Sequence, residues 1–515
     1  MEWSSAFVFY LISFIISSLV FLLLRHSGSN RRRFPPGPPG WPIIGNLFDL
    51  GSMPHRSLTD FRAKYGDVIW LRLGAINTMV ILSTKASTDF FKNHDLEFAE
   101  RTVTETMRVH GYDQGSLALA PYGSHWRALR RLVTVEMIVS KRINETVPIR
   151  AKCVNKMLEW IEEEAGKLGV GNGVHVARFV FLSTFNLLGN LMLSRDLWDP
   201  ESKDGSEFFG SMMGLLEWTG HANLADLFPW LKWLDPQGLQ RRMKRDLGKA
   251  LEIASEFVKE RVEAKKKKKK NEEDSRGGDL KKDFLDVLLE FEGSGKDEPT
   301  KISDRDLNIF ILEVFMAGAE TTSSSTEWAL TELLLNPESM TKAKAELNLV
   351  VGPNRKLEES DIEHLPYLQA VVKENLRLHP PIPFLVPRKA IQDTTFMGYH
   401  IPKNTQVFVD VWAIGRDPDV WDDPSRFKPE RFIGSKLDFK GQNYEYLPFG
   451  AGRRMCAGVP LAHRMLHLLL GSLIHQFDWE LDSSVTPETL DTKDKMGVTV
   501  RKSEPLLAVP KKCVV

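Results

Sequence analysis

The amino-acid sequence predicts a mainly α-helical protein of the α+β class, in which a large helical domain carries a small β-sheet subdomain. Three long segments, 303–335, 365–378 and 459–470, repeat apolar residues at the spacing of an α-helix. Two short segments rich in β-branched and apolar residues, 68–73 and 78–82, predict neighbouring strands of a small sheet. The excess of long helical patterns over short strand patterns sets the predicted class.

The composition argues against several classes of protein. The 515 residues contain 68 basic and 68 acidic side chains, so no net charge favours nucleic acid as a partner. The three cysteines, Cys153, Cys456 and Cys513, are too few and too scattered for a disulfide framework, which favours a reducing compartment. Cys513 also stands too close to the C-terminus to begin a prenylation box.

The N-terminal segment has the length and composition of a membrane anchor. No charged residue occurs between Trp3 and Leu24, and about 20 apolar residues are enough to cross a bilayer as a helix. The chain starts with Glu2, and its arginines follow the apolar run, whereas a cleaved signal peptide has a basic start. We therefore expect an uncleaved, single-pass anchor at 1–24, with the basic flank and the rest of the protein in the cytosol.

The segment after the anchor predicts a spacer. Residues 25–45 are basic and then proline-rich, and the run Phe34–Gly40 favours a stiff, extended chain. Residues 46–515 are then expected to form the folded domain. An acceptor sequence for glycosylation begins at Asn144, and a cytosolic domain would leave it unmodified.

The loop 449–458, Phe-Gly-Ala-Gly-Arg-Arg-Met-Cys-Ala-Gly, carries the most informative chemistry of the chain. Its glycines let the backbone turn sharply and approach a ligand closely. Arg453 and Arg454 make the loop electropositive, and the helix predicted from 459 points its positive end toward Cys456. These features favour a thiolate and predict that Cys456 binds a metal.

Three other roles for Cys456 are weaker. Most cysteines of intracellular proteins are buried apolar side chains, but the glycines and arginines around this one argue against that role. No second cysteine lies at the spacing of zinc ligands, and His463 and His467 are better explained as packed or exposed helix residues. A nucleophilic cysteine needs a base and an orienting partner, and the neighbouring sequence offers no obvious pair.

The pattern Phe-x-x-Gly-x-Arg-x-Cys-x-Gly, from Phe449 to Gly458, is similar to the haem-binding signature of cytochrome P450 monooxygenases. The resemblance covers nearly everything between Pro35 and Pro510, with the motifs of the family in the family's order. It implies the cytochrome P450 fold, with haem b (iron protoporphyrin IX) between a long central helix and the cysteine loop. It also implies that Cys456 is the iron ligand and that Phe449 helps to bind the haem.

The segment 317–322, Ala-Gly-Ala-Glu-Thr-Thr, lies in the middle of the helix predicted at 303–335. Glycine and hydroxyl side chains can loosen a helix locally, and burying Glu320 and two threonines would be costly in a plain core helix. They are therefore expected to reach solvent or to line a wet pocket. The segment is similar to the family's oxygen-activation motif, which implies that Thr321 hydrogen-bonds dioxygen, that Glu320 joins the proton relay and that Thr322 supports them.

Further matches to the family imply which residues hold the haem propionates. Trp126 and Arg130 are four apart on one face of a predicted helix and match the family's Trp-x-x-x-Arg pattern. Arg101, Arg388 and Arg454 match other propionate contacts of the family. Cationic and indole donors suit the two carboxylates of a haem.

A second group of matches is expected to be structural. Glu374 and Arg377 are three apart on a predicted helix, and such pairs on a surface are common and contribute little. In the family, however, Glu-x-x-Arg and a later arginine, here Arg431, form a buried triad behind the haem. We assign these three residues to the integrity of the fold and not to the chemistry.

Three remaining segments complete the expected architecture. The run Lys265–Lys270 predicts a solvated loop, since blocks of like charge repel; binding of nucleic acid or anionic lipid by this run is less favoured. Residues 383–388 are expected to be an extended strand beside the pocket. Residues 398–409 alternate between apolar and polar as the two arms of a hairpin should.

Within the family, the chain resembles plant microsomal members of the terpenoid-oxidising branch that includes geraniol hydroxylases and iridoid oxidases, chiefly through the phrase at 226–238. The resemblance implies a monooxygenase of the endoplasmic reticulum membrane that receives electrons from NADPH through NADPH-cytochrome P450 reductase, with cytochrome b5 as a second donor. Arg127 and Arg131 are the candidates for docking the acidic reductase. The expected substrate is a small hydrophobic plant metabolite, a monoterpenoid or iridoid, held by residues 102–119, 310–322, 382–386 and 496–497.

Other functions stay open at this point. Flavonoid and phenylpropanoid hydroxylases share most of the same motifs. A membrane haem protein that binds without oxidising, or a haem-thiolate isomerase, would not need the intact 317–322 segment. A structural, membrane-anchored interaction protein would bind no haem at all.

Overall fold

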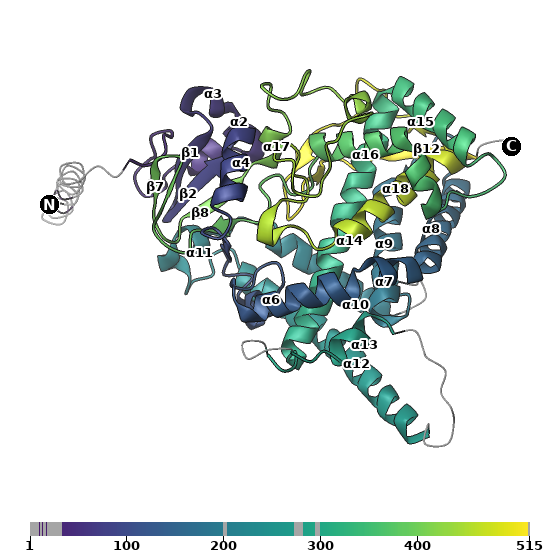
Figure 1. Cartoon of the computed structure of the whole chain (residues 1–515), viewed down its shortest axis with the longest axis horizontal. Helices are drawn as coiled ribbons and strands as arrows, with labels where there is room; N and C mark the ends of the chain where they lie inside the picture. The colour runs from purple at the N-terminus through teal and green to yellow at the C-terminus, as the bar shows by residue number, and fades with distance from the viewer. Residues whose placement is uncertain are drawn as a thin grey trace, which may run out of the picture.

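A long helix, α14 (Asp304–Leu335), crosses the middle of the molecule, with other helices arranged around it (Figure 1). Its start is fixed by Ser303, whose hydroxyl accepts the backbone N–H of Asp306 at 3.1 Å, as a helix cap does. Apolar residues on several faces, such as Phe310 and Phe315, are buried. The helix is therefore the centre of the core, as the sequence predicted.

The computed structural model describes Tyr10, Ser13 and Ser17 and the residues 33–198, 203–271, 282–293 and 299–512. The anchor predicted at 1–24 lies outside the described residues, apart from those three positions, and so does Cys513. The fold described here is that of the region from Arg33 onward.

The helices fill most of the chain. The α-helices are α2 (Pro54–Asp60), α3 (Arg62–Tyr65), α4 (Thr84–Asn93), α5 (Tyr112–Gly115), α6 (Ser124–Arg131), α7 (Ser140–Glu145), α8 (Val147–Leu168), α9 (Val176–Leu193), α10 (Lys203–Thr219), α11 (Leu224–Leu227), α12 (Leu239–Asn271), α13 (Phe284–Leu289), α14, α15 (Pro337–Val350), α16 (Pro366–Leu378), α17 (Val411–Ile414) and α18 (Val459–Gln476). Short 3-10 turns are η1 (Leu47–Leu50), η2 (Val109–Gly111), η4 (Pro229–Leu231), η6 (Glu359–His364), η7 (Pro429–Phe432) and η8 (Gly452–Arg454), and η3 (Leu132–Met137) is a π-helical turn. Helices α9, α12, α16 and α18 all pack against α14.

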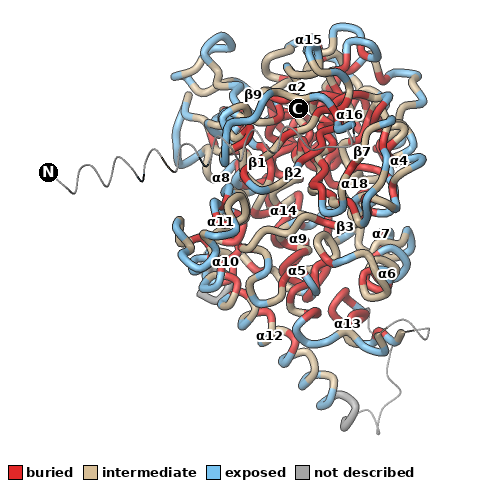
Figure 2. The backbone as a smooth tube through the Cα atoms, turned by 90° about the vertical axis from the view of Figure 1, so that its left-hand side faces the viewer, coloured by how far each residue is buried: buried red, intermediate tan, exposed pale blue. Residues whose placement is uncertain are grey.

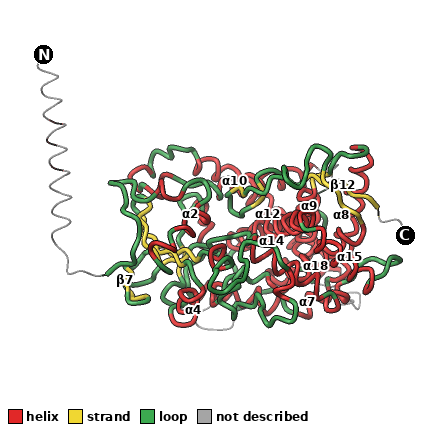
Figure 3. Tube along the Cα trace, turned by 90° about the horizontal axis from the view of Figure 1, so that it is seen from above, coloured by secondary structure: helices red, strands yellow, loops and turns green. Residues whose placement is uncertain are grey.

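The strands are short and gather mainly at one end of the molecule (Figure 3). A five-stranded sheet has the order β1 (Val68–Leu73), β2 (Ile76–Ile81), β8 (Gln406–Val409), β5 (Arg388–Lys389) and β3 (Glu100–Arg101). The smaller sheets are β4 (Val174–His175) with β12 (Leu507–Lys512) and β9 (Phe477–Leu481), β6 (Thr394–Phe396) with β7 (Tyr399–Ile401), and β10 (Asp494–Lys495) with β11 (Arg501–Lys502). The small sheet beside a large helical body agrees with the predicted class.

The register of the main sheet confirms one strand prediction and corrects two others. The two predicted strands are present as β1 and β2, which pair antiparallel, and β2 also runs parallel to β8, whose Val407 and Val409 are buried. The predicted hairpin at 398–409 is wrong, because β7 pairs with β6 while β8 pairs with β2 and β5. The strand predicted at 383–388 is also wrong, since only its last residue is a strand and Leu385 has a φ of 53°. A pattern of alternating apolar and polar residues identifies strands but does not show which strands pair with each other.

The lysine run Lys265–Lys270 was expected to be a loop and is instead the end of α12. The helix leaves the body of the protein near its C-terminal end (Figure 1). Lysine has a good helix propensity, and a helix that is already formed extends at little cost. Lys265 also pairs with Asp286 at 3.1 Å and with Glu290 at 2.9 Å, which offsets repulsion at the start of the run.

Among the described residues, α9 is the one helix long and apolar enough to span a membrane, with a hydropathy of 1.4. It is 78% buried and packs against α8 and α14. Its apolar character is therefore explained by its place in the protein core, where the buried backbone is concentrated (Figure 2).

Candidate active site

The cysteine loop runs from Phe449 to Gly458, contains the turn η8 and leads directly into α18. Gly450 and Gly452 have φ angles of 71° and 68°, in the left-handed region that glycine adopts without strain. The backbone N–H of Cys456 donates to the carbonyl of Phe449 at 3.0 Å, which closes the loop on itself. Pro460 stands in the first turn of α18, as the sequence predicted.

Gly452 is also needed because a buried carboxylate approaches the loop closely. A Cβ at this position would lie 2.2 Å from Oδ1 of Asp95. Asp95 accepts the backbone N–H of Arg453 at 3.1 Å, the Arg453 guanidinium at 2.8 Å and the Arg388 guanidinium at 2.7 Å. Asp95 thus ties the cysteine loop to strand β5 of the main sheet.

The sulfur of Cys456 has two properties that rarely occur together. Cys456 is accessible. Nevertheless, burial in the surrounding protein raises the pKa of its thiol. The backbone N–H of Gly458, the Arg130 guanidinium and the N–H of Val459 oppose that rise. A sulfur that is accessible and still surrounded by protein lines an internal space. The helix end contributes as predicted, but the raised pKa means that a bound metal would have to complete the deprotonation.

The arginines that stabilise the thiolate differ from the prediction. Arg453 turns to Asp95, and Arg454 donates to the carbonyls of Ala99 and Ala120. The nearby charge that lowers the pKa of Cys456 comes from Arg130, whose guanidinium donates to the carbonyl of Met455 at 2.7 Å. Sequence position identified the wrong arginines, because Arg453 and Arg454 make their contacts away from the neighbouring cysteine.

Helix α14 presents accessible residues in the middle of the core. Ala317 is exposed and Thr321 half-buried, although most of the helix around them is buried. The Thr321 hydroxyl donates to the carbonyl of Ala317 at 2.8 Å, and that of Thr322 to the carbonyl of Gly318 at 2.8 Å. The local break suggested by these residues is absent, because α14 is continuous and the hydroxyls bond within it.

Glu320 is the acidic residue of the same segment. Burial raises the pKa of Glu320, and Arg501, with Nη1 at 3.5 Å from Oε1, opposes the shift. Its other oxygen, Oε2, is buried and has no hydrogen-bond partner in the described part of the chain. A carboxyl group with a raised pKa and a free oxygen can hold or release a proton.

Three of the predicted propionate-binding residues are cations that contact no carboxylate in the described part of the chain, although Asp95 and Glu313 lie near enough to oppose the lowering of the pKa of Arg101. Arg101 and Arg454 are buried and Arg130 is half-buried, and among the described residues no carboxylate lies within 4.0 Å of any of them. Burial lowers the pKa of Arg101, and the neighbouring Arg388 and Arg454 lower it further; burial also lowers the pKa of Arg454, to about 10. Burying cations without an anion is costly. The cluster therefore fits a ligand with two carboxylates.

The other two predicted propionate contacts already have partners. The Trp126 indole N–H donates to the carbonyl of Leu117 at 2.9 Å, and the Arg454 guanidinium lies 4.5 Å from its ring centroid. Arg388 bonds Asp95 and the carbonyl of Ala451. Trp126 therefore belongs to the same cluster as Arg454, while Arg388 connects that cluster to the cysteine loop.

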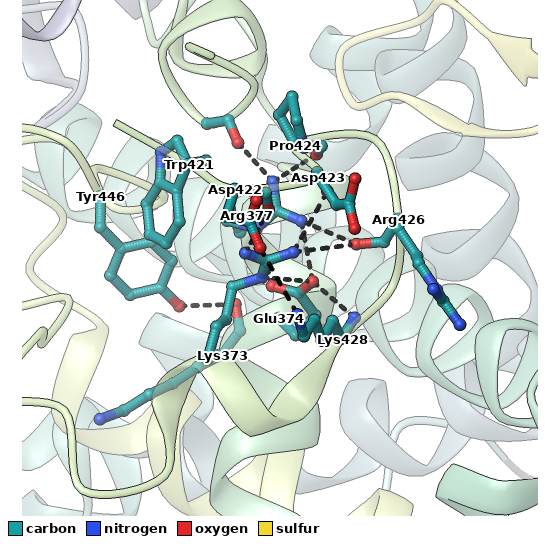
Figure 4. Close-up of polar contacts among 12 residues, drawn as sticks. Lys373, Glu374, Arg377, Trp421, Asp422, Asp423, Pro424, Arg426, Lys428 and Tyr446 are labelled. Carbon is teal, nitrogen blue, oxygen red and sulfur yellow. Dashed lines mark hydrogen bonds and ion pairs between the residues drawn. The ribbon is translucent and has the colours of Figure 1, made fainter. Parts of the chain in front are cut away.

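The predicted structural triad is confirmed (Figure 4). The Arg377 guanidinium donates to both oxygens of Glu374, at 2.7 and 2.8 Å, and Arg431 donates to the same carboxylate at 3.0 Å. Glu374 is 0% exposed and Arg377 2%. Arg377 also donates to the carbonyls of Gly415 and Pro424, so the triad fastens the chain that follows α17 to α16.

Sequence reasoning missed two acidic residues at this site. Asp95 and Glu313 are both buried, and their partners lie hundreds of positions away along the chain. Neither belongs to a recognisable motif. The one available signal was an acidic residue within an apolar helical pattern, which Glu313 shares with Glu320.

Comparisons with known proteins agree with this geometry. The family model for Cytochrome P450 matches residues 35–509. Cytochrome P450 76A2 of Solanum melongena is 55% identical over 513 residues, which cover 99% of this chain and 100% of that protein. Iridoid oxidase of Catharanthus roseus is 50% identical over 97% of this chain and 96% of its own length, and geraniol 8-hydroxylase of the same plant is 40% identical over 96% and 98%.

A solved structure of a zebrafish cytochrome P450 with progesterone matches with a TM-score of 0.73 and 25% identity, covering 89% of this chain and 99% of the other. The chain belongs to the cytochrome P450 family. It is accordingly an oxidoreductase of the monooxygenase type, a class that uses haem iron, a reductase partner and small hydrophobic substrates.

Proposed function

We propose that this monooxygenase hydroxylates a small plant terpenoid, a monoterpenoid or iridoid, with Cys456 as the ligand of haem iron. The observation that carries the haem assignment is an accessible sulfur enclosed by protein, beside a cluster of cations without carboxylates. When bound, the haem supplies the activation of dioxygen. The chain's own residues bind and orient it, exclude water and move protons.

Each site residue has a role in this proposal. Cys456 holds the iron, Phe449 packs beside the haem from the start of the cysteine loop, and the N–H groups of Gly458 and Val459 stabilise the negative sulfur. The propionates are bound by the following residues: Arg101, Arg130, Arg388 and Arg454, and Trp126, whose single N–H would exchange its bond to the Leu117 carbonyl for one to a propionate. An arginine forms a stronger hydrogen bond with a charged carboxylate than with a neutral backbone carbonyl.

Thr321 and Glu320 form the proton relay of the proposal. The Thr321 hydroxyl, bonded to the carbonyl of Ala317, can exchange that bond for one to a bound molecule. Glu320, whose pKa is raised by burial, can reload the hydroxyl with a proton from solvent through its free oxygen.

The terpenoid substrate is supported by the lining of the proposed pocket and by the relatives. Leu117, Leu119, Val314 and Ala317 are half-buried or exposed, and all are apolar. A pocket of this composition selects for shape and apolar surface. Iridoid oxidase and geraniol 8-hydroxylase are 50% and 40% identical to this chain.

Electron supply and location complete the proposal. Residues 1–24 anchor the protein in the endoplasmic reticulum membrane, 25–45 form a hinge, and 46–515 form the cytosolic catalytic domain. Electrons come from NADPH through NADPH-cytochrome P450 reductase, with cytochrome b5 as a second donor. Arg127 is the better docking candidate on α6, since it is exposed whereas Arg131 is half-buried.

The ligand assignment is tested by Cys456→Ala. The wild-type protein, reduced under carbon monoxide, is expected to show the red-shifted Soret band that thiolate ligation produces, and the variant is expected to lose it. An unchanged spectrum in the variant would falsify the assignment of Cys456. A wild-type protein that stays colourless when haem is supplied during expression would remove the haem proposal altogether.

The relay is tested by Thr321→Ala, with Thr322→Ala as a matched control because the two hydroxyls make the same bond within α14. Thr321→Ala should keep the thiolate spectrum while product formed per NADPH falls by about tenfold or more, the size of effect typical of a proton-transfer group. Thr322→Ala should stay near the wild-type ratio. Equal coupling in the two variants contradicts the relay.

The substrate class is tested with microsomes that contain the protein and its reductase. Monoterpenols and iridoids should be oxidised in an NADPH-dependent reaction, whereas flavonoids and phenylpropanoids should not. If only the flavonoids and phenylpropanoids are oxidised, the terpenoid proposal is replaced by that of a flavonoid or phenylpropanoid hydroxylase. Product without NADPH would indicate an isomerase instead.

A further inference from the structure

Glu313 is a buried carboxylate on α14 that the mechanism above does not use. It is 8% exposed and accepts three hydrogen bonds from one short segment. The donors are the Ser116 hydroxyl at 2.6 Å, the Leu117 N–H at 2.6 Å and the Ala118 N–H at 2.8 Å. All three bonds span nearly 200 positions in the chain, so Glu313 fastens a distant segment to the central helix.

That segment, residues 116–120, is called the connector below. Its carbonyls receive the side chains that surround the proposed propionate site. The Leu117 carbonyl accepts from the Trp126 indole at 2.9 Å and the Ala118 carbonyl from Arg101 Nε at 2.9 Å. The Ala120 carbonyl accepts from Arg454 at 2.6 Å. The connector therefore determines where three of the five proposed propionate contacts point.

The approach of the connector to α14 is close enough to require a glycine. A Cβ on Gly115 would lie 2.7 Å from Oδ1 of Asp306 and 3.0 Å from Cδ1 of Ile309, both on α14. Glu313 follows Ile309 by about one helical turn and Asp306 by about two, and it precedes Ala317 by about one. The helix that presents Ala317 and Thr321 thus also fixes the connector.

We propose that Glu313 is a positioning residue for haem binding. It holds the connector against α14 and so aims Arg101, Trp126 and Arg454 at the carboxylates of the haem. This inference rests on the proposed haem site. Burial raises the pKa of Glu313, while its three hydrogen bonds and Arg454 oppose the shift, so the cost of burying this acid is partly offset by the bonds that do the positioning.

The charge and shape of Glu313 are not replaceable by an amide. Both carboxylate oxygens accept, Oε1 from Ser116 and Ala118 and Oε2 from Leu117. A glutamine would turn an NH2 group toward a donor, because an amide has one accepting oxygen and two N–H donors. Glu313→Gln should therefore release one side of the connector without changing the volume of the core.

The experiment uses the full-length haem protein and compares Glu313→Gln with Glu327→Gln. Glu327 is a matched control, since it is buried on the same helix and accepts the Leu506 N–H at 2.8 Å, away from the connector. Release of haem to excess apomyoglobin is measured for each variant, together with the propionate bending bands in the resonance Raman spectrum. Glu313→Gln should release haem about tenfold faster or more, the usual effect of losing an outer partner, and shift those bands. Glu327→Gln should leave both within about twofold of wild type.

A second variant keeps the inference testable if Glu313→Gln does not fold. Ser116→Ala removes one donor and leaves the carboxylate, so haem release should rise by a smaller factor in the same direction. The double variant should release haem no faster than Glu313→Gln alone, because the two residues act through one bond. The positioning role is overturned if the Glu313 and Glu327 variants release haem at the same rate, or if the Raman bands of Ser116→Ala are unchanged. A wild-type protein that contains no haem overturns the proposed function instead.

Discussion

Two groups of buried arginines in this protein differ in whether the chain supplies their negative charge. Arg377 and Arg431 share the fully buried carboxylate of Glu374. Arg101 and Arg454 bond only to backbone carbonyls within the described part of the chain. The first group has its negative charge within the fold, while the second contacts no carboxylate among the described residues and is completed, in the proposal above, by the haem propionates. Buried cations without carboxylates therefore indicate a binding site more directly than arginine content does.

The largest effect that separates the two groups is expected from Arg377→Met. The substitution leaves Glu374 buried with only part of its partners, and breaking a buried ion pair costs about 3–5 kcal/mol. Urea unfolding of the purified protein should show this loss, or the variant should fail to accumulate in soluble form. As a control, Arg355→Met removes an exposed guanidinium that pairs with Asp361 and should destabilise the protein much less than Arg377→Met does. A mild effect at Arg377 would mean that the triad is not structural.

The same substitution in the second group, Arg454→Met, should change ligand binding more than folding. The substitution breaks no direct ion pair among the described residues, so the free energy of unfolding without haem should fall by only about 1–2 kcal/mol, from lost bonds to carbonyls. Haem release should become about tenfold faster, because a propionate loses a cation. Urea unfolding and haem transfer, both measured on one preparation, show whether the substitution affects folding or haem binding more. A loss of stability as large as at Arg377, with haem release unchanged, would remove the distinction between the groups.

Asp226 offers the smallest and most specific test, because this half-buried acid forms no ion pair with the described residues, although Lys232 and Arg108 lie near enough to oppose the rise in its pKa. Its Oδ1 accepts the Glu105 N–H at 2.7 Å and its Oδ2 is buried without a hydrogen bond, and burial raises the pKa of Asp226 to about 6. A carboxyl pKa raised by folding favours the protonated form. The cost to stability is thus absent below about pH 4, grows as the pH rises, and is constant above pH 6.

Asp226→Asn should therefore stabilise the protein at pH 7 by about 1 kcal/mol, reduced by solvent screening at this half-buried site, and should have almost no effect at pH 4. Urea unfolding at the two pH values measures this difference. The same stabilisation at both values would show that the acid is not destabilising through its charge.

The sequence was most informative where structure depends on neighbours along the chain. The cap at Ser303, the two ends of α16, the start of α18 and the first two strands follow from local patterns, whereas α18 runs to Gln476, beyond the predicted 470. It failed where partners are distant. The alternating pattern at 398–409 identified strands but not the strands they pair with. The lysine run was predicted to be a loop, although α12 continues through it.

At the site, motif positions named the residues but not their contacts. Resemblance to the family led to Arg454 and Arg388, yet Arg454 proved to have no carboxylate partner while Arg388 has Asp95. Asp95 and Glu313 were missed because their roles come from contacts made across the whole fold, which leave no spacing to recognise.

The contact between Asp95 and Gly452 has a consequence for protein engineering. Because any side chain at position 452 would meet the Asp95 carboxylate at 2.2 Å, a library that varies the cysteine loop alone will return only glycine there. Exchanging positions 95 and 452 together would open this part of the loop to redesign and offers a route to adjusting the redox behaviour of the bound iron.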